Sequence, residues 1–597
     1  MTHLPPIPSF LRRAPLRARA ALLALLLTAL PVAAAQSLPA LLPDDVHAAL
    51  GLVDLAAVEE RLAPFLDEAE RLGLVDALSG ALGGLGAGDL AEGDAGLPAP
   101  FGDLTLLDLV GREAWIAVSA SPFDPLPAVT LLARTSATAR DAFASAIADA
   151  STRPGTDRLE EAGRPFYVVV PEGGLLPDPD QPGADVGLPL AYAQLGDLVV
   201  LSSDPEVVRF ILRADAGSAT GRLTDRAAWQ ELQALGDGHV LGFLDPLPLT
   251  RALEPLATAS GAGPLLARIQ DALATAGPSV GVLRADDEGL LTLGRQRPDP
   301  AGPDPALYAL LSRGVAPTLD VLTFAPAGAP TVSAGTADLP AWWAWLDEVS
   351  RSAAELGVPT AREALELLEL DVDRLLLDWA GDGWALVQTA PLSAAQPGTA
   401  DAPLLGEQVL LVRSRDDATA QTALQELFAL AGATLGGFLD PSGQGAAAPE
   451  VATVAGLPVT RLRLSETLVL DAAVVDGWAL LSGSPDATAA VLGAYAAGGG
   501  ATALASLAAD LPDDVRSWSL AAAPSPDTGA ADALIAQLQL LAGLGGASTL
   551  DFEAVDRATE AVAAYAAFLA ERTGPSLSWT RWEDDALVTR QRIFLSW

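Results

Sequence analysis

The sequence predicts an α+β protein made of two tandem units of similar fold. Each unit is expected to be an antiparallel sheet with helices packed on one face, plus a helical portion at its N-terminal end. Two observations predict this class. Several blocks of the first half of the chain recur, in the same order, in the second half. Within each half, short β-like runs joined by tight turns alternate with segments of helical periodicity, which is typical of helices packed on antiparallel strands.

The recurrence is clearest in "AYAQLGDLVVLSSDPEVVRFIL" (191–212), which aligns without a gap with "DAAVVDGWALLSGSPDATAAVL" (471–492) at an offset of 280. Three further pairs of segments occur in the same order: 65–71 with 345–351, 130–143 with 410–424, and 277–297 with 574–592. We therefore predict repeat unit one at 36–300 and repeat unit two at 301–597, joined at the proline-rich "RPDPAGPDP".

Residues 1–35 have the composition of a signal peptide. Four arginines precede an apolar run that begins at Ala20 and ends on the small residues Ala33-Ala34-Ala35. The run is shorter than the ~20 residues that a spanning helix needs, and Pro31 interrupts it. We predict an exported protein, periplasmic or extracellular, with no transmembrane segment once the signal is removed. Retention of the signal as an anchor and twin-arginine export remain open alternatives.

The elements of each unit follow from periodicity. Apolar residues at spacings of three and four predict helices, and alternation predicts strands. In unit one we expect a helix at 56–73, strands at 114–120 and 128–134, a helix at 137–150, a hairpin at 190–202, a helix from 205, and a final hairpin at 279–295. Unit two is expected to begin with helices at 340–357 and 360–379. The glycine- and proline-rich segments 170–189 and 435–450 are predicted to be surface loops.

The turn in the central hairpin differs between the units. Gly196-Asp197 in unit one corresponds to Asp476-Gly477 in unit two. A glycine in first place suits a type II′ turn and Asp-Gly suits a type I′ turn, so we interpret Asp197 as a turn residue rather than a catalytic carboxylate. Asp204 and Ser484 each precede a proline, which predicts an N-cap followed by proline at the first helical position.

Composition excludes several classes of function. The 597 residues include 76 acidic and 35 basic side chains, all of the latter arginine, and no cysteine. A surface with this excess of negative charge repels phosphate backbones. We therefore expect no nucleic-acid partner. The absence of cysteine excludes disulfides and thiolate nucleophiles. The absence of lysine excludes lysine Schiff bases and the lysine of a P-loop. Outside the signal only His47 and His239 remain, and we predict no catalytic, metal-binding or cofactor-binding residue and no cofactor.

Three motifs invite a functional interpretation and are explained better by structure. "GPSVG" (277–281) fits a nucleophile-elbow pattern around Ser279, but a strand-like run follows it rather than a helix. "PDPDQPGAD" (177–185) resembles a calcium loop of alternating acids, and Pro182 breaks the spacing. The terminal "RQRIFLSW" resembles the last strand of an outer-membrane barrel, but a barrel requires many long alternating strands and little helix.

Aromatic and charged positions give further expectations. Trp342 and Trp345 align with Leu62 and Phe65 and are expected in the core, whereas Trp343 aligns with an alanine and is expected to be exposed. Asp347 with Arg351, like Asp67 with Arg71, is expected to form a surface helical ion pair. The run "RQR" occurs at Arg295–Arg297 and at Arg590–Arg592, where arginines on an edge strand would oppose sheet association or bind an anion. His47 and His239 are expected to be ordinary, partly buried residues.

The tandem strand, Gly-Asp-like turn, strand and Ser-x-Pro helix start together resemble a bacterial exported family known as domain of unknown function thirty-three fifty-two. The resemblance covers most of the chain after the signal. It implies an envelope protein of unassigned activity and supplies no catalytic or binding residue.

Three functions remain after these exclusions. The leading hypothesis is a non-enzymatic envelope or secreted protein that binds an unknown protein partner or hydrophobic ligand in a groove between units or subdomains. A second is a carboxylate-dependent hydrolase such as a glycosidase, which requires two acids in a cleft, one of them with a raised pKa. A third is a purely structural envelope component.

Overall fold

The computed structural model describes residues 38–74, 113–119, 127–169, 176–177, 185–186, 189–390, 407–439, 448–524 and 552–596, apart from residues 54, 136, 153, 154, 315, 367–369, 466, 467 and 501. The predicted signal peptide lies outside the described residues. The protein is a mixed α+β structure, 40% helical and 35% strand, built around a large antiparallel sheet. The predicted α+β class is therefore confirmed.

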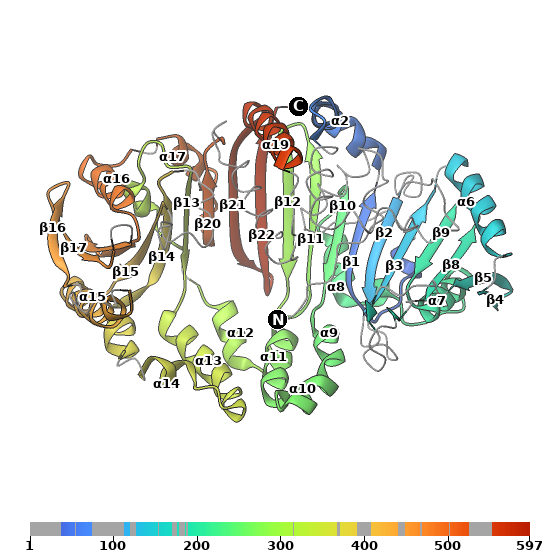
Figure 1. The fold of residues 1–597 in the computed structure, drawn as a ribbon, viewed down its shortest axis with the longest axis horizontal. Helices are drawn as coiled ribbons and strands as arrows, with labels where there is room; N and C mark the ends of the chain where they lie inside the picture. The colour runs from blue at the N-terminus through green and yellow to red at the C-terminus, as the bar shows by residue number, and fades with distance from the viewer. Residues whose placement is uncertain are drawn as a thin grey trace.

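Twenty of the described strands form one continuous sheet (Figure 1). From one edge to the middle the order is β4 (Thr156–Glu161), β5 (Arg164–Val169), β8 (Leu190–Leu195), β9 (Leu198–Ser202), β3 (Ala128–Arg134), β2 (Glu113–Ser119), β1 (Val46–Val53), β10 (Val240–Leu244), β11 (Ser279–Asp286) and β12 (Gly289–Gln296). From the middle to the other edge it continues with β22 (Ala586–Leu595), β21 (Thr573–Glu583), β20 (Val515–Ala521), β13 (Thr331–Thr336), β14 (Ala380–Gln388), β15 (Gln408–Ser414), β19 (Trp478–Ser482), β18 (Val469–Val475), β17 (Leu457–Arg463) and β16 (Glu450–Val454). The short strands β6 (Leu176–Pro177) and β7 (Asp185–Val186) pair only with each other.

The chain visits the strands of the two halves of this sheet in the same spatial order. In each half the first, second and third strands lie beside one another, the fourth reaches the outer edge, and the last reaches the middle. The halves meet where β12 pairs antiparallel with β22, with Leu293 opposite Arg590. We call the part of the structure that contains β1–β12 the first half and the part that contains β13–β22 the second half.

In each half a strand precedes the first of the helices expected there, and in the second half the helical segments Pro305–Ser312 and Leu319–Phe324 come before that strand. β1 precedes helix α2 (Leu55–Arg71), and β13 precedes helix α13 (Leu339–Arg351). The helix expected at 360–379 is also broken, because α14 ends at Glu366 and a single π-helical turn follows at Asp373–Leu377. Trp379, 0% exposed, enters the core directly after this turn, so burial of its side chain takes precedence over local helical periodicity.

Helices cover both faces of the sheet, not one face as expected. In the first half α7 (Pro205–Asp215) and α8 (Ala227–Ala234) pack with Val200, whereas Phe143 of α6 (Ala137–Ala150) packs with Val199. Neighbouring residues of a strand point to opposite faces, so these helices lie on opposite sides of the sheet. We call the α7 side face one and the α6 side face two.

The second half repeats this arrangement. Helices α16 (Pro485–Ala496) and α17 (Thr502–Ala508) pack with Leu480 on face one, and α15 (Asp417–Leu439) packs with Ala479 on face two. Residues 435–439, expected in a loop, form the end of α15. The remaining residues of the two predicted loops, 170–189 and 435–450, lie largely outside the described residues.

Two groups of helices lie at opposite ends of the central strands (Figure 1). One group contains α9 (Leu247–Ala252), α10 (Glu254–Ser260), α11 (Gly263–Ala276), α12 (Pro305–Ser312), α13 (Leu339–Arg351) and α14 (Ala361–Glu366); the other contains α2 (Leu55–Arg71) and α19 (Phe552–Arg572). Short 3-10 helices complete the described structure at Pro39–Leu41 (η2), Leu223–Asp225 (η4), Leu319–Phe324 (η5) and Ala354–Leu356 (η6).

The two helix groups interlock the halves. Phe65 of α2 packs edge-on against Phe568 of α19, with ring centroids 5.8 Å apart. Conversely, α13 of the second half packs against α11 of the first. At that contact the buried carboxylate of Asp304 accepts hydrogen bonds from Trp345 Nε1 at 2.8 Å and lies 3.2 Å from the guanidinium of Arg268.

The predicted turns and helix caps are confirmed. Gly196 has φ 67°, whereas both Asp476 and Gly477 have positive φ, 52° and 77°. The Asp204 side chain accepts from the amide of Glu206, and the Ser484 hydroxyl accepts from the amide of Ala487. Asp197 binds Arg134 at 3.1 Å on the surface, consistent with a turn residue.

Candidate functional site

The serine of the "GPSVG" motif lies on a strand. Ser279 is the first residue of β11 and pairs with Leu244 and Gln296 on its two neighbours. A nucleophile elbow requires a strand, a sharp turn and a helix. Ser279 is therefore not presented as a nucleophile, as the sequence indicated.

The calcium-like segment is described only at its ends, where Pro177 pairs with Asp185, and residues 178–184 lie outside the described residues. Within the described ranges no group of three or more Asp, Glu or His side chains is placed to hold a metal ion.

The three tryptophans of α13 are all half-buried. Trp343 is not the exposed residue that its alignment with alanine predicted, because its indole nitrogen is fully buried. Trp342 and Trp345 meet edge to face at 5.7 Å. None of the three side chains is exposed, so they do not form an exposed aromatic platform.

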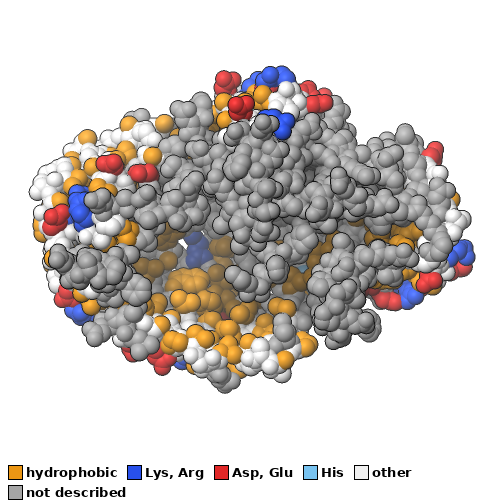
Figure 2. All heavy atoms as spheres, viewed as in Figure 1, with side chains coloured by type: hydrophobic (Ala, Val, Ile, Leu, Met, Phe, Trp, Pro, Cys, Tyr) orange, Lys and Arg blue, Asp and Glu red, His pale blue; other side chains and the backbone are white. Residues whose placement is uncertain are grey.

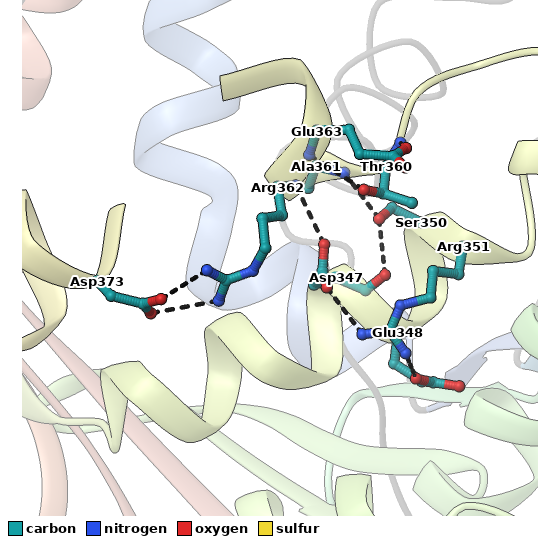
Figure 3. A network of polar contacts seen from close by, with 9 residues as sticks. All are labelled: Asp347, Glu348, Ser350, Arg351, Thr360, Ala361, Arg362, Glu363 and Asp373. Atoms are coloured by element: carbon teal, nitrogen blue, oxygen red, sulfur yellow. Dashed lines mark hydrogen bonds and ion pairs between the residues drawn. The ribbon is translucent and has the colours of Figure 1, made fainter. Parts of the chain in front are cut away.

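Asp347 is not a surface residue either. Its carboxylate, 7% exposed, accepts from Arg351 at 2.9 Å and from the amide of Arg362 at 3.1 Å, which joins α13 to α14 (Figure 3). Thr360 and Glu363 form a reciprocal capping box at the start of α14. In the first half Arg71 pairs with Glu68 and not with the expected Asp67. The Asp347 network is a structural junction between two helices.

The "RQR" runs lie in the middle of the sheet, which corrects the expected edge position. Their strands β12 and β22 pair with each other at the centre of the sheet. The two edges of the sheet are formed by β4 and β16. Arg295 binds Glu231 at 2.7 Å, and Arg592 binds Asp286 at 2.6 Å. These arginines hold the centre of the molecule together and do not protect an edge.

His47 is fully buried, at a β-bulge of β1 opposite Ser119. Burial lowers the pKa of its imidazole, and the nearby Asp245 opposes that shift. Asp245 is itself paired with Arg226. His239, half-buried, lies 3.3 Å from the carbonyl of Ala285 through Nε2. His47 is thus more deeply buried than expected, and His239 is placed as expected.

A buried carboxylate with a raised pKa does occur at Glu113, where burial is the main cause. One of its oxygens accepts from Trp115 Nε1 at 3.0 Å, and the other lies 3.8 Å from Arg134. Both oxygens are thus committed to protein groups. Glu113 is part of the core and is not placed as a general acid.

The strongest candidate site is the middle of face two. Strand pairing places one side chain from every second residue there, and we call this set the central floor. Its members on the second half are Thr331, Ser333, Ser517, Ser519, Ala521, Ser576, Ser578, Thr580, Trp582, Leu587, Thr589, Gln591 and Ile593, with Trp384 and Leu386 beyond them. Its members on the first half are Ala48, Leu50, Leu52, Ile116, Val118, Val240, Leu244, Ser279, Leu283, Leu290, Thr292 and Gln296.

The second-half part of the floor is uncharged and mostly polar, with Leu587 and Ile593 among its few aliphatic members. Ser333 donates to Ser519 at 2.8 Å, and the hydroxyls of Thr580 and Thr589 lie 3.2 Å apart. Ser578 and Gln591 are half-buried and have no side-chain hydrogen bond to any described residue. These groups therefore retain donors and acceptors for a ligand.

The first-half part of the floor is mostly apolar, with Ser279, Thr292 and Gln296 as its polar members. Leu50, Leu52, Ile116 and Val118 are only half-buried, whereas the alternate residues of the same strands, such as Trp115, are buried in the core on face one. Leu244 at the end of β10 is 48% exposed. The floor thus changes from mostly polar on β13, β20 and β21 to mostly aliphatic on β1, β2 and β10, with β12 and β22 carrying residues of both kinds.

Two tryptophans border the polar part. The half-buried ring of Trp384 lies across the backbone of Gly335, where a Cβ would be only 2.8 Å away. Trp582 meets Tyr308 of α12 edge to face at 6.2 Å and lies under the guanidinium of Arg516. Burial lowers the pKa of Arg516, which donates to the carbonyls that end α12.

The described helices leave the middle of β12 and β22 uncovered between the two helix groups (Figure 1). Figure 2 shows a hollow lined by hydrophobic side chains beside α12 and α13. Among the described helices, none combines the length and apolar character needed to cross a membrane.

Strand alternation was the sequence signal for the floor. In "SLSWTRW" (576–582), small polar residues alternate with Leu577, Trp579 and Arg581, which indicates one polar face. What the sequence did not reveal was that four such strands lie side by side. Comparison with family models, with curated proteins and with solved structures finds no match for this chain.

Proposed function

We propose that the chain is a tandem duplication, with units at 36–300 and 301–597. The common strand order of the two halves supports this, together with the four recurring blocks. The outermost hairpins add a local match: Ala162-Gly163 and Ala455-Gly456 both form turns with positive φ at each residue. Alanine rarely adopts positive φ, so its recurrence at one place favours common origin.

We propose that the protein is an exported binding protein that holds an amphiphilic ligand on the central floor. The observation that carries this proposal is that the described helices leave the middle of face two free, and that this surface is mostly uncharged and polar on the second half and mostly aliphatic on the first. No floor position carries Asp or Glu, so we propose binding and not carboxylate-dependent hydrolysis. The proposal of export rests on residues 1–35, and N-terminal sequencing of the secreted protein would test it.

The polar group of the ligand is expected to be uncharged. The chain has a formal net charge of −41, and its field opposes the approach of anions. Serine, threonine and glutamine side chains donate and accept hydrogen bonds, which suits hydroxyl groups. An acyl chain with a sugar or glycerol head fits both parts of the floor.

Calorimetric titration of the secreted protein with n-dodecyl maltoside, below its critical micelle concentration, tests this function. We expect saturable binding, and expect maltose or lauric acid alone to bind at least tenfold more weakly. Ser519→Phe and Ser578→Phe would fill the polar part and weaken binding by roughly tenfold or more, the equivalent of 1.4 kcal/mol.

Ser506→Phe is the matched control, because Ser506 is an exposed serine of α17 on face one. It should leave binding unchanged. Equal weakening by all three variants, or no saturable binding of the maltoside, would refute the proposed ligand class. Tight binding of maltose alone would redirect the proposal to a carbohydrate.

A further inference from the structure

The two outer edges of the sheet differ in their protection. Four of the six residues of β4 are charged, namely Asp157, Arg158, Glu160 and Glu161. β16 has the sequence EVATV, with a single charge at Glu450. Charged side chains discourage pairing at a sheet edge, so β16 is the less protected edge.

The backbone of β16 presents two residues outward. The two-residue turn makes Val454 and Leu457 a hydrogen-bonded pair. Along an antiparallel ladder, hydrogen-bonded pairs alternate with non-hydrogen-bonded pairs, whose backbone groups point away from the partner strand. Val451 and Thr453 therefore direct their N–H and C=O groups away from β17. Pro458 lies opposite Thr453, where no amide donor is needed. The side chain of Val451 is 70% exposed, and Thr453 is also exposed.

We propose that β16 pairs antiparallel with β16 of a second copy of this chain, about a two-fold axis at Ala452. In this register Val451 of each copy lies opposite Thr453 of the other, so both outward-facing residues find partners. Four backbone N–H···O=C hydrogen bonds form, and the two sheets become continuous.

The charges suit this register and limit its strength. Glu450 lies opposite Val454 of the other copy, so no like charges face each other directly, and Arg461 is the neighbour of Glu450 on β17. A strand of five residues buries far less than the ~1,600 Å² of a standard stable interface, so the dimer is weak. Because each copy carries a net charge of −41, added salt strengthens the association.

Disulfide trapping tests the register directly. The chain has no cysteine of its own. Ala452→Cys places two thiols across a non-hydrogen-bonded pair, where Cα atoms are about 4.5 Å apart and a disulfide can form. Leu159→Cys is the matched control, because Leu159 has the same place in β4. We expect oxidised A452C to run as a covalent dimer and oxidised L159C to stay monomeric.

Sedimentation equilibrium of the secreted protein tests the unmodified dimer. We expect the apparent mass to rise with concentration up to about 0.5 mM, more steeply in high salt. Thr453→Pro removes one outward-facing amide and should weaken dimerisation at least tenfold, whereas Glu160→Pro in β4 should not. Val451→Lys gives a second test if T453P does not fold. A monomer at all concentrations, or equal trapping of A452C and L159C, overturns the proposal.

Discussion

The β5–β8 pair in the first half and the β17–β18 pair in the second occupy the same place in the strand order but fill it with different chemistry. Val168 lies opposite Ala191 in the first pair. Arg461 lies opposite Asp471 in the second, with two hydrogen bonds of 2.7 and 2.8 Å. Ala191 and Asp471 are both 0% exposed. The same strand pairing therefore tolerates either an apolar pair or a bidentate ion pair, provided that the buried groups match each other.

Breaking the ion pair should give the largest effect. Asp471→Ala leaves the guanidinium of Arg461, which is 16% exposed, without its partner. We expect the free energy of unfolding to fall by about 3 to 5 kcal/mol, because a largely buried charge is left uncompensated. Urea denaturation followed by tryptophan fluorescence would measure the loss.

The double variant Arg461→Val/Asp471→Ala copies the first half and is the control. It should recover to within about 1 kcal/mol of the native protein, because an apolar pair can replace a buried ion pair. If the double variant is as unstable as D471A, the two pairs are not interchangeable.

A second correspondence involves glycine and tryptophan. Gly51 lies opposite Trp115 and Gly335 lies opposite Trp384, but the first pair is in the core on face one and the second is on the central floor. An added Cβ at Gly51 would overlap the ring of Trp115, which is 1% exposed and also packs against Trp229. Gly51→Ala should cost about 1 to 3 kcal/mol by overpacking.

Gly335→Ala should cost less than G51A, since the half-buried ring of Trp384 has room to move. Its main effect is expected on ligand binding at the floor. Parallel denaturation and titration of the two variants would separate these roles, and equal losses of stability would show that both tryptophans serve the core.

A third difference is the presence of His47 in β1, while β13 has no titratable side chain. Burial holds the pKa of His47 below its ordinary value of 6.5. Below that pH the unfolded chain takes up a proton that the folded chain does not, so stability should fall on acidification by at most about 1.4 kcal/mol per pH unit. His47→Leu should reduce this slope between pH 6.5 and the folded pKa. An unchanged slope would assign the acid sensitivity to other groups.

The smallest effect is expected at the turn where the halves exchange glycine and aspartate. Asp197 is 54% exposed and pairs with Arg134. Asp197→Ala should lower the stability by only a few tenths of a kcal/mol, because exposed ion pairs contribute little. A loss above about 1 kcal/mol would show that this aspartate does more than occupy a turn.

Local elements were predicted well from the sequence, and long-range features were not. The bounds of α6 and β3 match the predicted 137–150 and 128–134, because amphipathic periodicity is a local property. Whether a strand lies at the edge or the centre of the sheet depends on which distant strands it pairs with, and a single sequence does not show this. The "RQR" runs were therefore predicted at an edge, although they lie in the middle of the sheet. Helices on both faces were missed because the strands β9 and β19, buried on both sides, show continuous apolar runs instead of alternation.

The candidate site was harder to predict. Most floor residues on β13, β20 and β21 are ordinary serines or threonines with no motif around them. Their common feature is register, which appears only when the strands lie side by side. The central floor could therefore be suspected strand by strand from alternation but not assembled from the sequence.

Pairing of β12 with β22 has a consequence for how the chain reaches its native state. Leu293 and Arg590 are roughly 300 residues apart in the sequence, yet they meet in the middle of the sheet. Until β22 has been synthesised, β12 is an open strand edge beside apolar residues. Such long-range pairing is slow, and an open edge is prone to aggregate while it waits. Chaperones are therefore expected to bind the incompletely folded chain first along β12.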